Sequence, residues 1–225
     1  TALVPGDPVK AQVLASIYSL KSYTYAEYHE LLASGEIDAV YVATPNFLHA
    51  QYVLPALSAG IHVLLEKPMA TTEAECREMA NVAERTGAKL MVAYRLHCEP
   101  GTLEMIERVK GEFGDPRVFT STFAQVVKAS NHRNQNGFAA GPVADMGPYP
   151  SNMVRKLFNA EPIEVMALGS KTPGSPLHSW DTVAVSQRFP QERLAHFTVS
   201  YTLPDTERFQ LLGTKGEIEA SPCFG

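Results

Sequence analysis

The sequence predicts an α/β unit followed by an α+β unit. Two different patterns of apolar and polar residues along the 225 residues support this prediction. Up to about residue 95, strands of about five apolar residues alternate with helical patterns, which is what a parallel sheet with crossover helices requires. Beyond that point, longer strands of alternating polarity are separated by turn residues. This second pattern favours an open, mainly antiparallel sheet that helices cover on one face.

In the first half we expect strands at residues 2–4, 38–43, 61–65 and 89–93, and helices at residues 8–20, 25–34, 47–59 and 72–87. Thr72 and Glu75 have the spacing of a capping box, in which a hydroxyl and a carboxylate satisfy free helix amides. Gly60 is suited to end the third helix. Pro55 lies inside that helix, where proline costs up to about 3 kcal/mol, so we expect a kink or a break there.

In the second half strands predominate. We expect strands at residues 117–127, 163–168, 182–189, 194–201, 209–212 and 217–220. One amphipathic helix is predicted at residues 99–110, and another follows Gly147. Such an open sheet leaves one face to bury, so we also expect this unit to form a homo-oligomer, a dimer or a tetramer, through its sheet.

Composition and charge exclude several classes of protein. There are 19 Lys and Arg against 24 Asp and Glu, a net charge of −5 without a basic patch, so no nucleic acid is expected as a partner. No apolar run approaches the roughly 18 residues of a membrane span. The three cysteines stand far apart and no HxH or HxxxH pair occurs, so we expect no metal site. Scattered thiols fit a reducing compartment, and the cytoplasm is the default expectation.

Two short motifs follow neighbouring strands of the first half. Glu66-Lys67-Pro68 comes directly after residues 61–65, and Thr44-Pro45-Asn46 comes after residues 38–43. In an open α/β sheet, ligands bind outside the carboxyl ends of the strands, so both motifs are placed for function. Each has a plain alternative. Lys67 could be a surface lysine at a turn, and the second motif could be a helix start with turn-forming residues, which local evidence favours.

Four segments in order resemble the Gfo/Idh/MocA oxidoreductases: DAVYVATPNFLH (38–49), AGIHVLLEKP (59–68), VAYRLHCEP (92–100) and ADMGPY (144–149). Within that family the last two are most similar to the glucose-fructose oxidoreductase branch and its NADP-dependent relatives. The resemblance covers nearly the whole chain. It implies a Rossmann domain for a dinucleotide at residues 1–95, and a domain for substrate binding and oligomerisation at residues 96–225.

The resemblance also implies a catalytic set. Lys67 would contact the nicotinamide ribose and the substrate hydroxyl, with Pro68 after a cis peptide bond, and Asp145 and Tyr149 match the acid/base pair. A phenol of ordinary pKa about 10 needs a nearby cation such as Lys67 to work near neutrality. A helix that begins near Asp145 would put Asp145 and Tyr149 on one face. The residues alone favour another interpretation, in which Asp145 caps a helix with Pro148 in its first turn.

By the same resemblance, Arg95 and His97 would line the substrate pocket, although a solvated linker is the alternative for both. His49 could contact the cofactor or be a first-turn helix residue. Trp180 and Asp181 are expected to pack only. The implied cofactor-binding residues are Gly6, Lys10, Thr44, Pro45, Asn46, His49, Glu66, Lys67, Pro68 and Arg95, and the implied substrate residues are Lys67, Arg95, His97, Asp145 and Tyr149.

The sequence departs from the family at its glycines. A dinucleotide site needs a glycine-rich turn, yet no G-x-G pair occurs. The opening TALVPGD resembles the family's second strand, so we expect the first strand, phosphate loop and first helix, roughly 30 residues, to be missing. The final ASPCFG resembles a segment that normally continues. We therefore expect a chain truncated at both ends, and any export signal would lie in the missing start.

The end of the first strand bears on cofactor choice. An NAD site usually places an acidic residue there to hold the ribose diol, whereas a 2′-phosphate asks for small residues and a cation. Here Gly6 ends the strand and Lys10 lies one turn into the helix, which favours NADP, with NAD still possible. Asp7 could approach the ribose or simply cap the helix.

Together these features predict hydride transfer between the nicotinamide of NADP and a sugar or cyclic diol. Tyr149 would move the proton, Lys67 would lower its pKa, and Asp145 would hold the network. Two alternatives stay open. One is a non-catalytic regulator of the same fold that senses the dinucleotide, and the other is a fragment that binds no cofactor.

Overall fold

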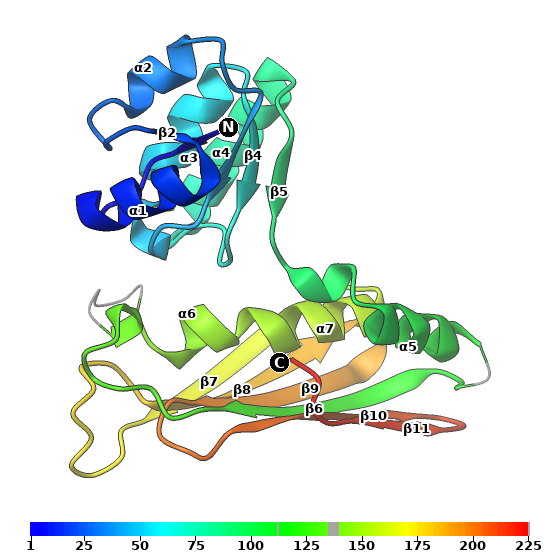
Figure 1. The fold of residues 1–225 in the computed structure, drawn as a ribbon. Helices are drawn as coiled ribbons and strands as arrows, with labels where there is room; N and C mark the ends of the chain where they lie inside the picture. Colours follow the sequence, from blue (N-terminus) through cyan, green and yellow to red (C-terminus); the bar gives the residue numbers. More distant parts are fainter. Residues whose placement is uncertain (112, 135–139, 225) are drawn as a thin grey trace. The chain divides into compact units, whose positions relative to one another are not determined.

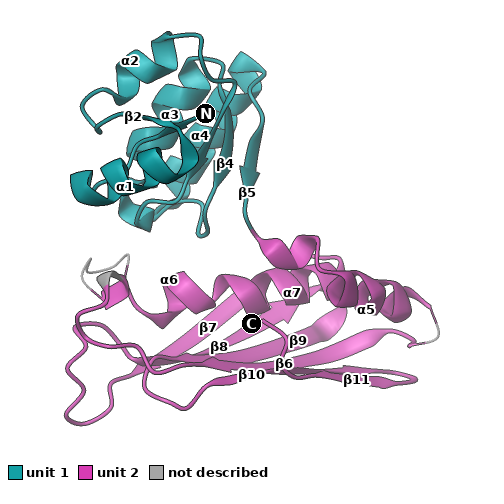
Figure 2. Ribbon diagram, viewed as in Figure 1, with its two compact units in different colours: residues 1–93 teal, residues 94–225 magenta. Residues whose placement is uncertain are grey.

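The computed structural model describes residues 1–111, 113–134 and 140–224, which form two compact units (Figures 1 and 2). Unit 1 is residues 1–93 and unit 2 is residues 94–225. The division falls two residues before the boundary expected from the sequence. Ala93 still donates its amide to the Leu65 carbonyl, at 2.8 Å, while Arg95 donates to the main chain of unit 2 at Phe224. No helix in the described part of the chain is long and apolar enough to span a membrane.

Unit 1 alternates strands and helices, and all its strand pairs are parallel. The strands pair as β1–β2 and as β3–β4–β5. In chain order the elements are β1 (Ala2–Leu3), α1 (Pro8–Tyr18), β2 (Lys21–Ser22), α2 (Tyr28–Ala33), β3 (Ala39–Val42), the 3-10 turn η1 (Asn46–Leu48), α3 (His49–Ser58), β4 (His62–Leu65), α4 (Glu73–Thr86) and β5 (Leu90–Val92). The predicted Rossmann-type parallel arrangement is confirmed.

The helix signals in the sequence work as predicted, with one exception. Thr72 Oγ1 accepts from the Glu75 amide at 3.2 Å and Glu75 accepts from the Thr72 amide at 3.1 Å, so the capping box is formed. Gly60 follows α3 with φ of +77°. Of the kink or break expected at Pro55, the break is wrong, because α3 runs from His49 to Ser58 without interruption. The carbonyl that Pro55 leaves without an amide belongs to Gln51, an exposed residue that water can reach.

The core of unit 1 lies between the parallel strands and helices α3 and α4. Val63 and Leu65 of β4 are buried, as are Val53 and Leu57 of α3. Tyr28 of α2 joins this core and donates its hydroxyl to the Tyr52 carbonyl at 2.9 Å. Burial raises the pKa of Tyr28 to about 12. The strands are thus held as a rigid base for the loops that follow them.

Unit 2 is a six-stranded sheet in the order β11-β10-β6-β9-β8-β7. Of the described pairs in this sheet only β6–β9 is parallel, which confirms the mainly antiparallel prediction. The elements are the 3-10 turn η2 (Arg95–His97), α5 (Pro100–Lys110), β6 (Pro116–Ala124), the 3-10 turn η3 (His132–Asn134), α6 (Pro142–Met146), α7 (Pro148–Phe158), β7 (Glu164–Ser170), β8 (Thr182–Phe189), the 3-10 turn η5 (Pro190–Glu192), β9 (Arg193–Ser200), β10 (Thr206–Gly213) and β11 (Glu217–Ala220).

The helices of unit 2 cover one face of this sheet (Figure 1). Alternate side chains of the strands, such as Phe119, Phe189 and Phe197, point into the core with Val154 and Leu157 of α7. Residues of the opposite alternation face away from the helices. The large apolar side chains exposed on that outer face are Met166, Leu168, Leu194 and Leu212.

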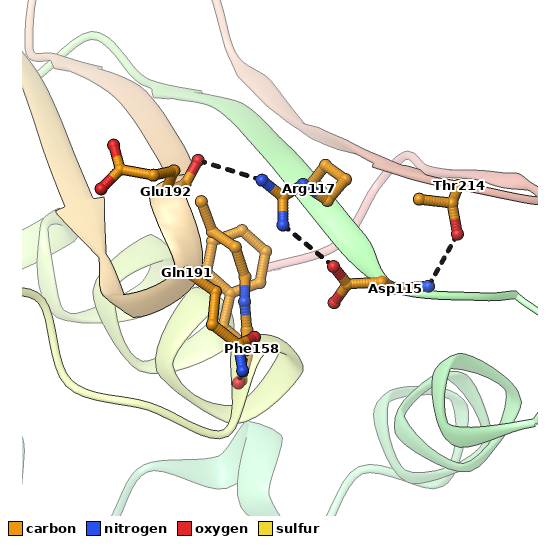
Figure 3. A network of polar contacts seen from close by, with 7 residues as sticks. Asp115, Arg117, Phe158, Gln191, Glu192 and Thr214 are labelled. Atoms are coloured by element: carbon orange, nitrogen blue, oxygen red, sulfur yellow. Dashed lines mark hydrogen bonds and ion pairs between the residues drawn. The ribbon is translucent and has the colours of Figure 1, made fainter.

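A polar network ties together three segments at one end of the sheet (Figure 3). Arg117 donates to Asp115 at 2.9 Å and to the Glu192 carbonyl at 3.4 Å. The Asp115 amide donates to Thr214 Oγ1 at 2.9 Å. Gln191 and Glu192, in the three-residue loop between β8 and β9, both have left-handed φ, +65° and +57°. The start of β6 is thereby joined to two hairpin loops.

Candidate active site

The carboxyl ends of β3 and β4 carry the first group of candidate residues. Thr44 follows β3, and its buried Oγ1 has no hydrogen-bond partner in the described part of the chain. Lys67 follows β4, and the Lys67–Pro68 peptide bond is cis, as predicted. Both loops lie where a parallel sheet binds its ligands.

His49 joins these two loops. Its Nε2 lies 2.9 Å from the Thr44 carbonyl, and its Nδ1 lies 2.9 Å from the Pro68 carbonyl. The residue begins α3 and is 1% exposed. The structure therefore gives His49 a supporting position, in which it holds the loops after β3 and β4 at a fixed separation.

Glu66 is held by its neighbours on the sheet. The Tyr41 hydroxyl donates to Glu66 Oε1 at 2.5 Å, and the Lys67 amide donates to Oε2 at 3.2 Å. The hydrogen bond to Glu66 raises the pKa of Tyr41. This link fixes the start of the loop that carries Lys67.

The start of α1 resolves the two interpretations of Asp7. Its carboxylate accepts from the Val9 amide at 2.9 Å and from the Lys10 amide at 3.2 Å, so it caps the helix. Gly6 lies before it, and a Cβ there would be 3.3 Å from the Tyr25 ring. The Lys10 side chain is exposed on the first turn. Gly6 and Lys10 thus lie on either side of Asp7, whose carboxylate already accepts hydrogen bonds from helix amides.

Asp145 and Tyr149 of unit 2 stand one helical turn apart. Helices α6 and α7 meet at Gly147, whose φ of −57° and ψ of −32° continue the helical path. A Cβ on Gly147 would lie 2.4 Å from the Val143 carbonyl oxygen, which explains the glycine. The alternative in which Asp145 caps the helix with Pro148 in its first turn is wrong, because Asp145 lies inside α6 and the N-cap of α7 is Gly147.

Two residues that sequence reasoning missed hold the Asp145 carboxylate. The Tyr201 hydroxyl donates to Asp145 Oδ2 at 3.0 Å, and Arg133 Nε lies 3.2 Å from the same oxygen. The Asp145 side chain is 13% exposed. Tyr201 ends a predicted strand, but Arg133 lies in a segment for which no element was predicted, so no local pattern connects either residue to Asp145.

The Tyr149 ring lies against two further aromatic rings. Its centroid is 5.3 Å from that of Phe123 in an edge-on contact, and 5.9 Å from that of Phe224. The Phe224 carbonyl accepts from the Arg95 guanidinium, and its amide donates to Glu207 at 3.1 Å. Arg95 and Tyr149, both predicted for the site, are therefore linked through Phe224.

His97 lies near the cationic side of α7. Burial lowers the pKa of His97, and the charges of Lys156 and Arg155 lower it further. Its buried Nε2 has no hydrogen-bond partner among the described residues, and its ring lies 5.8 Å from that of Tyr94. At neutral pH the ring is uncharged, so it offers one donor and one acceptor to a hydroxyl group.

Asp181 and Trp180 occupy positions that stabilise the second sheet. Asp181 is fully buried and accepts from the Thr172 amide and hydroxyl, at 2.9 and 3.1 Å. Trp180 lies over Gly169, where a Cβ would approach the indole to 2.8 Å. Both contacts stabilise the segment that connects β7 to β8.

Two family models match this chain. Residues 1–94 match the model of an oxidoreductase family with an NAD-binding Rossmann fold. Residues 102–219 match the model of the GFO/IDH/MocA C-terminal domain. The two matches follow the two units of the structure.

Relatives of established name are similar along the whole chain. An NADP(+)-dependent D-xylose 1-dehydrogenase from Haloarcula marismortui is 31% identical, over 100% of this chain and 65% of the relative. The trans-1,2-dihydrobenzene-1,2-diol dehydrogenase from Macaca fuscata fuscata is 30% identical, over 89% of this chain and 60% of the relative. The chain thus spans about two thirds of the length of such relatives.

A solved structure with the same fold is the aldose-aldose oxidoreductase from Caulobacter crescentus complexed with glycerol. It superposes with a TM-score of 0.93 at 30% identity, over 100% of this chain and 69% of that one. The agreement extends through both units.

Proposed function

This chain belongs to the Gfo/Idh/MocA oxidoreductases, and from that premise we propose that it transfers a hydride between NADP and a sugar or a cyclic diol. The observation that carries the proposal is the Asp145–Tyr149 pair, one helical turn apart, with Asp145 held by two donors and Tyr149 packed against Phe123 and Phe224. An ordered phenol beside an ordered carboxylate suits proton transfer at a substrate hydroxyl.

In this proposal each residue has one role. Tyr149 takes the proton from the hydroxyl that is oxidised, or returns it in the reverse direction, while bound NADP supplies the hydride acceptor. Lys67, at the carboxyl end of β4, supplies a positive charge that contacts the nicotinamide ribose and the substrate hydroxyl. Asp145 orients the reacting groups, and Arg95 and His97 bind substrate hydroxyls.

The residues of unit 1 suit a dinucleotide. Thr44 has a buried hydroxyl with no partner among the described residues, so it has a hydrogen bond to offer a ligand at the end of β3. Pro45, Asn46, Glu66 and Pro68 complete the two loops that His49 joins. We assign these residues to cofactor binding.

NADP is preferred over NAD because of the start of α1. Asp7 would be the acidic ligand of a ribose diol, but its carboxylate accepts two helix amides instead. Gly6 is the small residue at this position, and the exposed Lys10 offers a cation for a 2′-phosphate. The NADP(+) dependence of the D-xylose 1-dehydrogenase relative supports the same choice.

The substrate class follows from the named relatives together with the uncharged His97. The relatives act on D-xylose and on a dihydrobenzene diol, both of which carry neighbouring hydroxyl groups. A neutral imidazole and a guanidinium can bind such hydroxyls without requiring an anionic substrate.

The experiment that tests the proposal is a fluorescence titration of the chain with NADPH and with NADH, followed by turnover of NADP⁺ with D-xylose, D-glucose and cyclic diols. We expect micromolar binding with NADPH tighter, and reduction of NADP⁺ by at least one substrate. Binding without turnover would favour the regulator. No binding of either dinucleotide would favour the fragment that binds no cofactor and would exclude the proposed activity for this chain.

The oligomeric state and the compartment belong to the same proposal. The exposed Met166, Leu168 and Leu194 on the outer face of the sheet support a homodimer formed through that face. Light scattering at micromolar concentration should give twice the monomer mass, and a monomer there would exclude this interface. The three cysteines are free thiols, which supports the cytoplasm.

A further inference from the structure

Tyr201 is fixed in the core of unit 2 independently of its hydroxyl. The residue is fully buried. Its amide donates to the Asp181 carbonyl at 2.8 Å, and its carbonyl accepts from the Val127 amide at 3.0 Å. Main-chain bonds on both sides therefore set the direction in which the phenol extends from the end of β9.

The phenol crosses from the sheet to helix α6 and donates to Asp145 Oδ2 at 3.0 Å. Burial and the charge of Asp145 raise the pKa of Tyr201, so its hydroxyl keeps its proton and acts as a donor at neutral pH. Arg133 Nε approaches the same oxygen, at 3.2 Å. Both donors therefore converge on Oδ2, which fixes the orientation of the carboxylate.

We propose that Tyr201 and Arg133 are positioning residues, which hold Asp145 through Oδ2 and so orient its carboxylate for the reaction at Tyr149. This inference rests on the proposed function, since it assigns a task to Asp145 in that reaction. Only the fold brings Tyr201 to Asp145, because the two residues are 56 positions apart in the chain and lie in different segments of the structure.

The competing explanation is purely structural: a buried phenol needs an acceptor, and Asp145 supplies one. The two explanations differ in what happens when the hydroxyl is removed. A structural bond affects stability alone, whereas a positioning bond affects the rate of the chemical step through Asp145.

A double-mutant cycle separates the two. Tyr201→Phe should lower kcat about tenfold, the effect expected from losing one hydrogen bond to a charged group, while KM and the Kd for NADPH stay within about twofold. In the Asp145→Ala background, Tyr201→Phe should cause no further loss, because the side chain through which it acts is gone. Equal losses of kcat in the two backgrounds, or unchanged kcat in Tyr201→Phe, would overturn the inference.

A second readout does not depend on activity. If the hydroxyl donates to Asp145, the loss of Tm caused by Tyr201→Phe should be smaller in the Asp145→Ala background than in the wild type, because the acceptor is already gone. Tyr28→Phe is the matched control, because that buried hydroxyl donates to the Tyr52 carbonyl in unit 1, so its loss of Tm should be the same in both backgrounds.

The two failures are distinguishable. A wild-type chain that binds NADPH but turns over no sugar or diol removes the proposed function, and with it the positioning role of Tyr201. A loss of Tm in Tyr201→Phe that is as large in the Asp145→Ala background as in the wild type overturns the pairing with Asp145, whatever the activity.

Discussion

At the scale of single residues, the packing around Tyr149 bears directly on its proposed role. Its ring contacts Phe123 and Phe224, which restrict the rotation of the phenol. Folding has already restricted the rotamers of this side chain. Little further side-chain entropy is therefore lost when the hydroxyl binds the substrate during turnover. Asp145 one turn earlier is ordered in a different way, by two donors.

Removing the Tyr149 hydroxyl should separate chemistry from binding. Tyr149→Phe keeps the ring and its two aromatic contacts but cannot move a proton. We expect kcat to fall by about 100-fold or more, while the Kd for NADPH stays within about twofold. Steady-state rates together with a fluorescence titration check this. Turnover equal to that of the wild type would remove Tyr149 from the mechanism.

Lys10 should decide between the two dinucleotides. Lys10→Ala removes a cation proposed to pair with the 2′-phosphate, so we expect NADPH binding to weaken about tenfold and NADH binding to change by less than about twofold. Lys21→Ala is a suitable control, because that lysine pairs with Glu36 at 2.7 Å instead. Equal weakening of both dinucleotides by Lys10→Ala would mean that the 2′-phosphate is recognised elsewhere.

The candidate residues differ in how far sequence could identify them. Lys67, Asp145 and Tyr149 lie in motifs, so the family resemblance is sufficient to select them. Arg133 and Tyr201 lie 12 and 56 positions from Asp145, and only the packing of α6 against β9 brings that tyrosine to the carboxylate. Asp7 had two interpretations, since capping depends on the direction of the carboxylate, which sequence does not contain.

At the scale of elements, the loop between β8 and β9 is under backbone strain. Gln191 and Glu192 both have left-handed φ, a region that costs a side-chain-bearing residue about 1 kcal/mol and costs glycine little. Arg117 holds this loop through the Glu192 carbonyl (Figure 3), and Arg193 donates to the Gln191 side chain.

Glycine should relieve part of this strain. Glu192→Gly keeps the carbonyl that Arg117 uses and loses only an exposed ion pair with Arg188, which contributes little. We expect a gain of up to about 1 kcal/mol in the free energy of unfolding, measured by urea denaturation. Gly174, already at φ of +78°, is the control: Gly174→Ala should destabilise. A lower urea midpoint for Glu192→Gly would show that the strain is released elsewhere.

Most elements were predictable because they carry apolar runs or helix caps. Each predicted strand is present, with ends that differ by at most three residues. Strand β2 was missed because Lys21 and Ser22 are polar and exposed, so no apolar run marks them. Helix α6 was missed because its five residues begin at a Gly-Pro step. The glycine at position 147 also gives no indication in the sequence that the helical path continues into α7. The order of strands in the second sheet was not predictable, because it depends on pairings across long stretches of chain.

At the scale of the whole molecule, buried acids that retain their protons set the response to alkali. Burial raises the pKa of Tyr28 in unit 1 and of Cys223 in unit 2 to about 12 each. In the unfolded chain these groups ionise near their ordinary values of about 10 and 8.5. Above those values the native state binds more protons than the unfolded state, so stability falls as pH rises.

The urea midpoint should accordingly stay level up to about pH 8.5 and then decline toward pH 11, with each group adding up to about 1.4 kcal/mol per pH unit to the slope. Cys223→Ala should flatten the part of the decline that begins near pH 8.5. Cys98→Ala is the control, because Cys98 is exposed. A midpoint that is constant to pH 11 would contradict the assignment of buried, protonated groups.

The central place of β6 in its sheet also governs how the protein is made. Both partners of β6, strands β9 and β10, begin about 70 or more residues after β6 ends. A ribosome adds about 5–20 residues per second, so β6 waits roughly 4–15 s for its first partner. Strand β3, by contrast, finds β4 within about 20 residues. Unit 1 can therefore be complete while β6 is still an unpaired, partly apolar strand, and the need for chaperone protection during synthesis falls on unit 2.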